Sequence, residues 1–202
     1  MEEKKDKIVN YEYYHWGPFL YRTVLGLEEL KAINKLCAKE ESKDNRKNLA
    51  GLIRHEYKIK PVDLFKIIGP YFHSYASAYT ETRQTLLANK IELVDSWVNY
   101  MTKFESNPVH THDGDLSFVI YTQIPQGLKK EVNETISNKS QPGSINFIYV
   151  LNNAKMLLNQ HSFMPTVGDF FIFPAHLHHY VNPFKCEGER ISISGNLKLT
   201  ST

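Results

Sequence analysis

The chain has 202 residues and a mass of 23.4 kDa, which suits one sizeable hydrophobic core and is short for two. Hydrophobic residues make up 42% of the chain and charged residues 23%, which argues against a disordered protein. The chain has 24 Lys and Arg residues against 22 Asp and Glu residues. This near-balance of charge argues against a protein that binds nucleic acid mainly by neutralising its phosphates.

We expect a single domain over residues 1–202, with a helical N-terminal support in residues 1–90 and a β-rich core in residues 91–202. The two cysteines, Cys37 and Cys186, are too few for a disulfide framework and are expected to be free and buried. Residues 1–7 lack the apolar stretch of a secretory signal, and no window approaches the length of a membrane span. These features predict a cytoplasmic protein with no membrane partner, which could act as a homodimer.

Two helices are expected in the first half of the chain. Residues 27–41 place Leu30, Ile33, Leu36 and Cys37 on one face, which is the spacing of an amphipathic helix. A second helical region runs from Pro61 to about Asn89, with Pro61 in its first turn and the pair Gly69-Pro70 interrupting its middle.

From Ile91 onward the pattern changes to short β-type runs separated by turn residues. The expected strands are Ile91–Met101, Pro108–His112, Leu116–Ile124, Ile145–Leu151, Asp169–Phe173, His179–Val181 and Arg190–Lys198. No helix of useful length intervenes, so the pattern favours an antiparallel sandwich or barrel over alternating strands and helices. The turn-rich segment 125–144 is expected to be a loop over the active site or a surface excursion.

Two histidines one residue apart, His110 and His112, precede a turn that carries Asp113 and Asp115. Side chains at positions i and i+2 of a strand point to the same face, so this pair could bind one cation that a distant residue closes from the other side. Burying such a pair costs free energy unless something satisfies its nitrogens. The alternative is a histidine cluster with a purely structural role.

Three more histidines, His176, His178 and His179, follow the apolar run from Gly168 to Pro174. Strand alternation allows only some of them to face inward. His179 directly precedes Tyr180 and Val181, and we take it as the distal metal ligand. His176 and His178 are expected to be exposed or to contact the ligands rather than the metal.

Arg190 begins an alternating strand on which Arg190, Ser192 and Ser194 share one face. A guanidinium on an inward strand face needs an anion, and a carboxylate bound at two points is its best partner. Ser192 can add a hydrogen bond to the same oxygens. A surface salt bridge to Glu187 or Glu189 is the alternative, which the apolar opposite face of the strand disfavours.

Taken together, these residues resemble the double-stranded β-helix oxygenases that use iron(II) and 2-oxoglutarate, in particular the prolyl-hydroxylase-like branch of bacteria and phages. The similarity spans roughly Asp95 to Leu197, and its motifs are specific as an ordered set rather than singly. They are Ser96-Trp97-Val98-Asn99, His110-Thr111-His112, Leu116-Ser117-Phe118-Val119-Ile120-Tyr121, the segment from Gly168 to Val181, and the strand from Arg190 to Asn196.

The resemblance implies a mainly β protein with N-terminal helices, whose core is a double-stranded β-helix, a jelly-roll or cupin-like barrel. It also implies Fe(II) held by the first motif and His179, with the distal carboxylate of 2-oxoglutarate held by Arg190 and Ser192. The wider superfamily has His-x-Asp or His-x-Glu in its first motif, whereas this chain has His112 at the carboxylate position. Two ligand sets are possible. Either the three histidines His110, His112 and His179 form the site, or an aspartate of the following turn restores a carboxylate ligand, with Asp115 favoured over Asp113.

The implied reaction uses dioxygen, converts 2-oxoglutarate to succinate and carbon dioxide, and inserts oxygen into a C–H bond of a second substrate, such as a peptidyl proline. Tyr100 and Tyr121 are candidate walls that could hydrogen-bond the co-substrate, although core packing is the favoured role for both. A cupin-like metalloprotein that uses no 2-oxo acid and a non-catalytic binding module on the same barrel are the competing functions.

Overall fold

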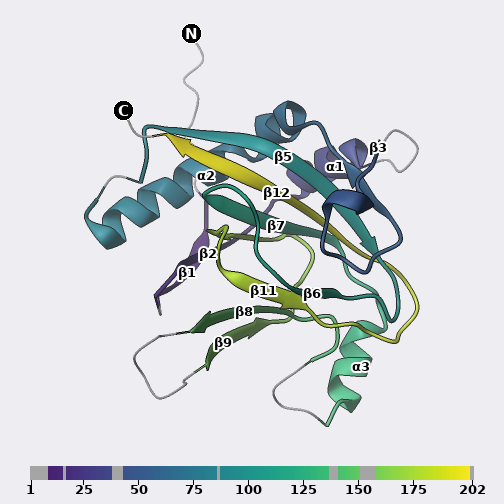
Figure 1. Cartoon of the computed structure of the whole chain (residues 1–202). Helices are drawn as coiled ribbons and strands as arrows, with labels where there is room; N and C mark the ends of the chain where they lie inside the picture. Colours follow the sequence, from purple (N-terminus) through teal and green to yellow (C-terminus); the bar gives the residue numbers. More distant parts are fainter. Residues whose placement is uncertain are drawn as a thin grey trace.

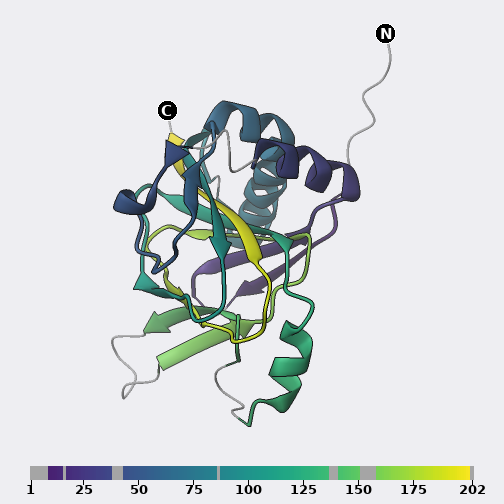
Figure 2. The ribbon, with the colours of Figure 1, turned by 90° about the vertical axis from the view of Figure 1, so that its right-hand side faces the viewer.

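The computed structural model describes residues 9–15, 17–37, 43–85, 87–136, 141–150 and 158–200. Two antiparallel sheets lie face to face, and helices cover the outer side of the larger sheet (Figure 1). Figure 2 shows the resulting layers, with the two longer helices, the larger sheet and the smaller sheet in succession. The mainly β architecture with N-terminal helices that the sequence predicts is confirmed.

The larger sheet has eight strands in the order β1-β2-β10-β7-β12-β5-β4-β3, and the smaller sheet has four in the order β6-β11-β8-β9. The strands of the larger sheet are β1 (Tyr11–His15), β2 (Phe19–Val24), β3 (Lys43–Asp44), β4 (Glu56–Lys58), β5 (Lys90–Met101), β7 (Leu116–Gln123), β10 (Asp169–Pro174) and β12 (Arg190–Thr200). Those of the smaller sheet are β6 (Asn107–His110), β8 (Ile145–Val150), β9 (Leu158–Phe163) and β11 (His178–Val181). Because β12 pairs with β5 on one side and β7 on the other, the last strand lies within the sheet rather than at its edge.

Strand alternation divides the interior into two apolar cores. On β7, Phe118 and Ile120 belong to the core beneath the helices, whereas Val119 and Tyr121 belong to the core between the two sheets. This alternation is the reason that the strand reads as a continuous apolar run, because both of its faces are covered.

The helices are α1 (Leu27–Leu36), α2 (Pro61–Arg83), the short α3 (Leu128–Glu134) and a 3-10 turn, η2 (Arg46–Asn48). The helix α2 runs unbroken through Pro70, so the interruption expected there is wrong. A proline removes one hydrogen-bond donor, but Phe72 and Tyr75 in the following turn are almost fully buried against the sheet and hold the helix in place. The helix ends at Arg83 rather than at the expected Asn89, because the next residue, Gln84, adopts a left-handed conformation.

The first 90 residues also contribute four strands to the larger sheet, so the expectation of a helical support was incomplete. The hairpin of β1 and β2 joins the sheet through β10, and β4 pairs with β5. The sequence gives little sign of them because short strands near a sheet edge owe their conformation to partners that are distant in the chain.

The seven expected strands of the second half are all present, and each begins within one residue of its expected start. The strand β9 was missed, and α3 lies inside the segment 125–144 that was expected to be a loop. The expected ends of the first helix at Glu41 and of one strand at Leu151 lie outside the described residues.

Both cysteines are free, as the sequence predicts, with Cys37 buried and Cys186 half-buried. Among the described residues, none of the helices has the length and apolar character that crossing a membrane would require.

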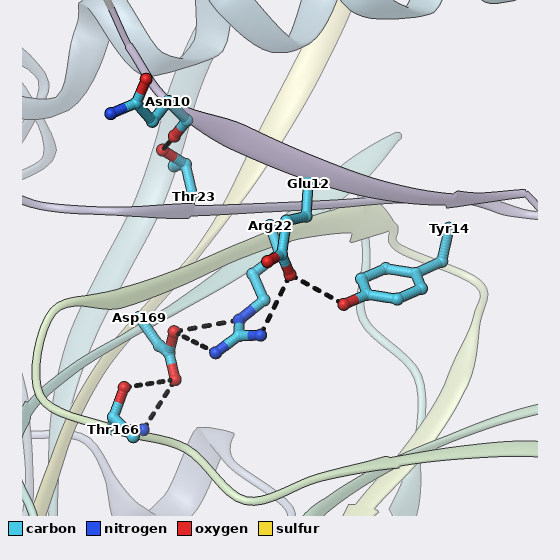
Figure 3. A network of polar contacts seen from close by, with 7 residues as sticks. All are labelled: Asn10, Glu12, Tyr14, Arg22, Thr23, Thr166 and Asp169. Carbon is cyan, nitrogen blue, oxygen red and sulfur yellow. Dashed lines mark hydrogen bonds and ion pairs between the residues drawn. The ribbon is translucent and has the colours of Figure 1, made fainter.

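A buried ion pair ties β10 to the N-terminal hairpin (Figure 3). The carboxylate of Asp169, at the start of β10, is completely buried and accepts hydrogen bonds from Arg22 Nε at 3.0 Å and from the backbone N–H and hydroxyl of Thr166. Arg22 also contacts Glu12, which accepts a hydrogen bond from the Tyr14 hydroxyl. The aspartate of the Gly168-Asp169 motif therefore holds the sheet together, and its carboxylate is fully used in doing so.

We expect Arg22→Met to lower the free energy of unfolding by about 2 kcal/mol, because it leaves the Asp169 carboxylate buried without its cation. Chemical denaturation would measure the loss, and the double variant Arg22→Met/Asp169→Asn should recover part of it. Arg46→Met, which removes an exposed ion pair with Asp44, is the matched control and should change stability little. Equal stability of Arg22→Met and the unmodified protein would contradict a stabilising role for this pair.

Candidate metal centre

Strand pairing in the smaller sheet brings His110 and His179 together. His110 ends β6, and it lies opposite His179 of β11 in the antiparallel register, with 4.2 Å between the ring centroids. His112 lies beyond the end of the strand, so the expected i and i+2 arrangement on one strand is wrong. Its backbone N–H donates to the carbonyl of Ala175, and this contact turns the chain so that its ring also meets His179.

The three imidazoles offer one ligand atom each, and all of these atoms lie within 4.8 Å of one another. The Nε2 atoms of His112 and His179 are 3.1 Å apart. The Nδ1 atoms of His179 and His110 lie 2.9 and 2.7 Å from the carbonyl oxygens of Leu177 and Pro108, so these backbone groups orient both rings. If Nδ1 carries the proton, Nε2 of each ring remains free to bind a metal.

Burial lowers the pKa of all three histidines, and their mutual proximity lowers it further in His112 and His179. The pKa of His112 falls to about 3. The imidazoles are therefore neutral, which is the protonation state that binds metal. Three imidazole nitrogens suit Fe(II), although zinc and copper also accept such a donor set.

The two aspartates of the following turn have different environments. Gly114, between them, has a φ of +95°, and a Cβ there would lie 2.8 Å from the Leu197 carbonyl oxygen, so the turn requires glycine. Asp115 accepts a hydrogen bond from the Leu199 N–H at 2.7 Å and does not join the histidine cluster. Asp113 is exposed and lines a cleft beside His110 and His112. Our preference for Asp115 over Asp113 as a substitute ligand therefore has no support in the geometry.

Arg190 lies in the same inter-sheet cavity as the three histidines. It is 2% exposed, and it donates one hydrogen bond, from Nη1 to the Gly143 carbonyl at 2.9 Å. Its Nε has no partner, and no carboxylate of the described residues pairs with it, so the alternative of a salt bridge to Glu187 or Glu189 is wrong. Burial lowers the pKa of Arg190, which reflects the cost of holding this charge without an anion.

Ser192, Ser194 and Tyr121 line this cavity with Arg190. The Tyr121 ring lies 5.4 Å from the guanidinium, and its buried hydroxyl has no hydrogen-bond partner. Burial raises the pKa of Tyr121 to about 12, so the hydroxyl is a neutral donor. The cavity thus presents two donors without acceptors, Arg190 Nε and Tyr121 Oη, beside two unpartnered acceptors, Oδ1 of Asn99 and of Asn107.

Tyr100 does not belong to the site, and its expected role as a wall is wrong. It lies in the core beneath the helices, and its hydroxyl donates to the Cys37 carbonyl. The register of β12 against β5 explains the error. Arg190 pairs with Met101, so the Met101 side chain shares the face of Arg190, and the side chain of the preceding residue, Tyr100, points to the opposite face. His176 and His178 are exposed, as expected.

Several residues that line the cavity had no predicted role, chief among them Trp97 and Asn99 of β5. Trp97 is buried and its ring packs against His112, with 5.6 Å between centroids. Alternation in Trp97-Val98-Asn99 was the available signal, since it places an aromatic and an amide on the inward face. Ile53 also lines the cavity, and its loop carries no comparable signal.

Comparison with known families identifies the class of protein that this fold and site define. Residues 95–196, just over half of the chain, match the family described as "Putative 2OG-Fe(II) oxygenase". The chain therefore belongs to this family of oxidoreductases, which use Fe(II) and take 2-oxoglutarate and dioxygen as co-substrates. No curated protein sequence matches the chain.

Solved structures share the fold at low sequence identity. A 2OG-Fe(II) oxygenase family oxidoreductase from Burkholderia pseudomallei is 13% identical with a TM-score of 0.56, covering 86% of this chain and 79% of that one. A Pseudomonas putida prolyl-4-hydroxylase is 17% identical with a TM-score of 0.53, covering 89% and 92%. HygX from Streptomyces hygroscopicus, solved with nickel, 2-oxoglutarate and hygromycin B, is 11% identical with a TM-score of 0.56, covering 91% and 83%. These likenesses confirm the double-stranded β-helix.

We expect His179→Ala to weaken Fe(II) binding by more than about 100-fold, because losing even a group that orients a metal ligand costs roughly 10- to 100-fold. Anaerobic calorimetric titration would measure the affinity. His178→Ala is the matched control, since this neighbouring histidine of β11 is exposed and should leave binding unchanged. Equal losses in both variants would count against the histidine cluster as the metal site.

Proposed function

We propose that His110, His112 and His179 hold Fe(II) and that Arg190, Ser192 and Tyr121 hold the distal carboxylate of 2-oxoglutarate, so that the enzyme hydroxylates a C–H bond. When bound, iron and the 2-oxo acid supply the oxidising chemistry. One dioxygen and one 2-oxoglutarate then yield succinate, carbon dioxide and the hydroxylated product.

The observation that carries this proposal is the unpaired, buried guanidinium of Arg190 in the cavity that the histidines line. A buried charge without a counterion costs several kcal/mol unless an anion joins it. A dicarboxylic acid that binds a metal through its 2-oxo acid end supplies this anion through its other end. A cupin-like metalloprotein has no comparable use for Arg190.

The strands around Arg190 hold the binding groups in fixed positions. Arg190 and Ser192 share one face of β12, a strand hydrogen-bonded on both sides, and Ser192 lies opposite Tyr121 of β7. Groups on paired strands are more rigidly placed than groups on loops. Their role is to orient the co-substrate, while the apolar walls Val119, Ile145 and Phe173 exclude water.

The cavity volume is about 30 Å³, which is room for water but not for 2-oxoglutarate. Co-substrate binding therefore requires neighbouring side chains to move. The hydrogen bond from Arg190 to the Gly143 carbonyl is the contact that a carboxylate would replace, because a charged acceptor binds a guanidinium more strongly than a neutral carbonyl does.

A peptidyl side chain such as proline is one candidate substrate, supported by the likeness in fold to the Pseudomonas prolyl-4-hydroxylase. The HygX structure contains hygromycin B, so this fold also accommodates ligands other than peptides. The fold alone thus leaves the substrate class open.

We expect Arg190→Met to weaken 2-oxoglutarate binding by about 100-fold, the loss of two charge-assisted hydrogen bonds, while Fe(II) binding is retained. The weak visible charge-transfer band of the anaerobic Fe(II)–2-oxoglutarate complex would report binding, and succinate would report turnover. Tyr121→Phe should weaken binding by about tenfold, the loss of one such bond.

Arg54→Met is the control for this series, since the Arg54 side chain is largely exposed and lies outside the cavity. Undiminished 2-oxoglutarate affinity in Arg190→Met would refute the assignment of this residue. If the unmodified protein bound iron tightly but never formed succinate with any substrate pool, the non-catalytic module would be the better account.

A further inference from the structure

A second, wider cleft adjoins the inner cavity at the histidines. Its volume is about 330 Å³, and it shares Trp97, Asn107, His110 and His112 with the inner cavity. A molecule in this cleft would lie directly beside two of the three candidate metal ligands. The cleft is therefore placed to hold the substrate that is oxidised.

The charged lining of this outer cleft is acidic. Glu56, Asp95 and Asp113 line it, and no Lys or Arg of the described residues does. Lys58 lies 4.0 Å from Asp95 and offsets that charge, whereas neither Glu56 nor Asp113 has an ion-pair partner among the described residues. The cleft thus favours cations over anions, most strongly when Glu56 is ionised.

The buried polar atoms without partners in the outer cleft are oxygens. They are Oε2 of Glu56, Oδ1 of Asn107 and Oδ1 of Asn196, and Glu56 is only 1% exposed. The ionised carboxyl of Glu56 only accepts hydrogen bonds, whichever way the neighbouring amides are turned. Buried polar groups are normally satisfied, so these oxygens indicate a ligand that brings N–H donors.

Strand register connects Glu56 to the inner site. Glu56 of β4 lies opposite Asn99 of β5, Asn99 lies opposite Ser192 of β12, and Ser192 lies opposite Tyr121 of β7. Directly opposed residues of antiparallel strands share a face, so these side chains form one polar row across the sheet. Glu56 ends the row on the side of the outer cleft.

We propose that the outer cleft binds the primary substrate through a cationic N–H group, an ammonium or a guanidinium, held over Glu56 and beside Trp97. This inference rests on the proposed oxygenase function and adds the substrate class. Trp97 lines both cavities, so a cation in the outer cleft would lie beside an aromatic side chain. The free amine or guanidine and the basic side chain of a peptide carry the same chemistry.

The environment of Glu56 makes cation binding depend on the protonation state of its carboxyl. Burial, and then the nearby Glu105, raise the pKa of Glu56 to about 8, while Arg46 lowers it and Asp44 raises it slightly. The carboxyl is thus mostly protonated at neutral pH and must lose a proton to pair with a cation. Affinity for a cation should accordingly rise as the pH increases through 8, because the ionised fraction of Glu56 rises.

The test is a calorimetric titration of the full chain in the absence of iron and 2-oxoglutarate. The two probes are capped arginine and capped citrulline, and citrulline has nearly the same shape as arginine but carries no charge. We expect arginine to bind at least about tenfold more tightly, the contribution of a charge-assisted hydrogen bond. We also expect its affinity to rise by about 25-fold between pH 6.5 and 8.5, as the ionised fraction of Glu56 rises. Agmatine against a capped arginine tripeptide distinguishes a small molecule from a peptide.

Glu56→Gln should abolish the preference for arginine and its pH dependence, and Asp113→Asn, at an exposed position, should reduce the preference without risk to folding. Glu134→Gln on α3, outside both cavities, is the matched control. Equal binding of arginine and citrulline, tighter binding of capped glutamate, no saturable binding of any probe, or a preference that survives both variants would each overturn the proposal. The readout needs neither metal nor co-substrate, so its failure is separate from a failure of the Arg190 assignment.

Discussion

The burial of His179 and Arg190 between two β-sheets, with His110 and His112 half-buried beside them, is the constraint on which the rest of the structure depends. Each of these groups loses hydration in the folded state, and the guanidinium gains one hydrogen bond, to a neutral carbonyl, in return. The aromatic cores on both faces of the larger sheet supply the free energy that offsets this cost. Stability in the apolar regions therefore permits polar groups without partners at the site.

The larger sheet keeps those groups in place because its central strands pack closely. Gly195 of β12 shows how closely, since a Cβ at this position would lie 2.5 Å from the Asp95 carbonyl oxygen of β5 and 2.7 Å from the Phe118 ring of β7. The same strand carries Arg190 and Ser192 at its start. A binding group on this strand has little freedom to shift, which suits the orientation of a small dicarboxylic acid.

Much of the barrel and part of the site could be predicted from the sequence. The strands of the second half were recognisable because apolar and β-branched runs end at turn residues, and His179 and Arg190 were placed correctly by alternation. The convergence of His112 had a different cause, the backbone contact with Ala175, which no local pattern encodes. Tyr100 was misplaced because its face follows from the pairing of Arg190 with Met101, a long-range register. Glu56 was missed for the same reason, since the position of its short strand is set by pairing with β5.

The two cavities differ in the charge of the groups that line them, and this difference would direct two ligands to different places. The inner cavity contains the buried guanidinium of Arg190 and no carboxylate of the described residues, whereas the outer cleft contains Glu56, Asp95 and Asp113 and no Lys or Arg of the described residues. A dicarboxylate is attracted to the first and opposed by the second, and a cation has the reverse preference. On this view neither ligand competes for the place of the other, and the histidines at the boundary of the two cavities are where both meet. The absence of a carboxylate among the three clustered histidines would then matter as well, because a metal bound by neutral ligands keeps its full positive charge for the 2-oxo acid.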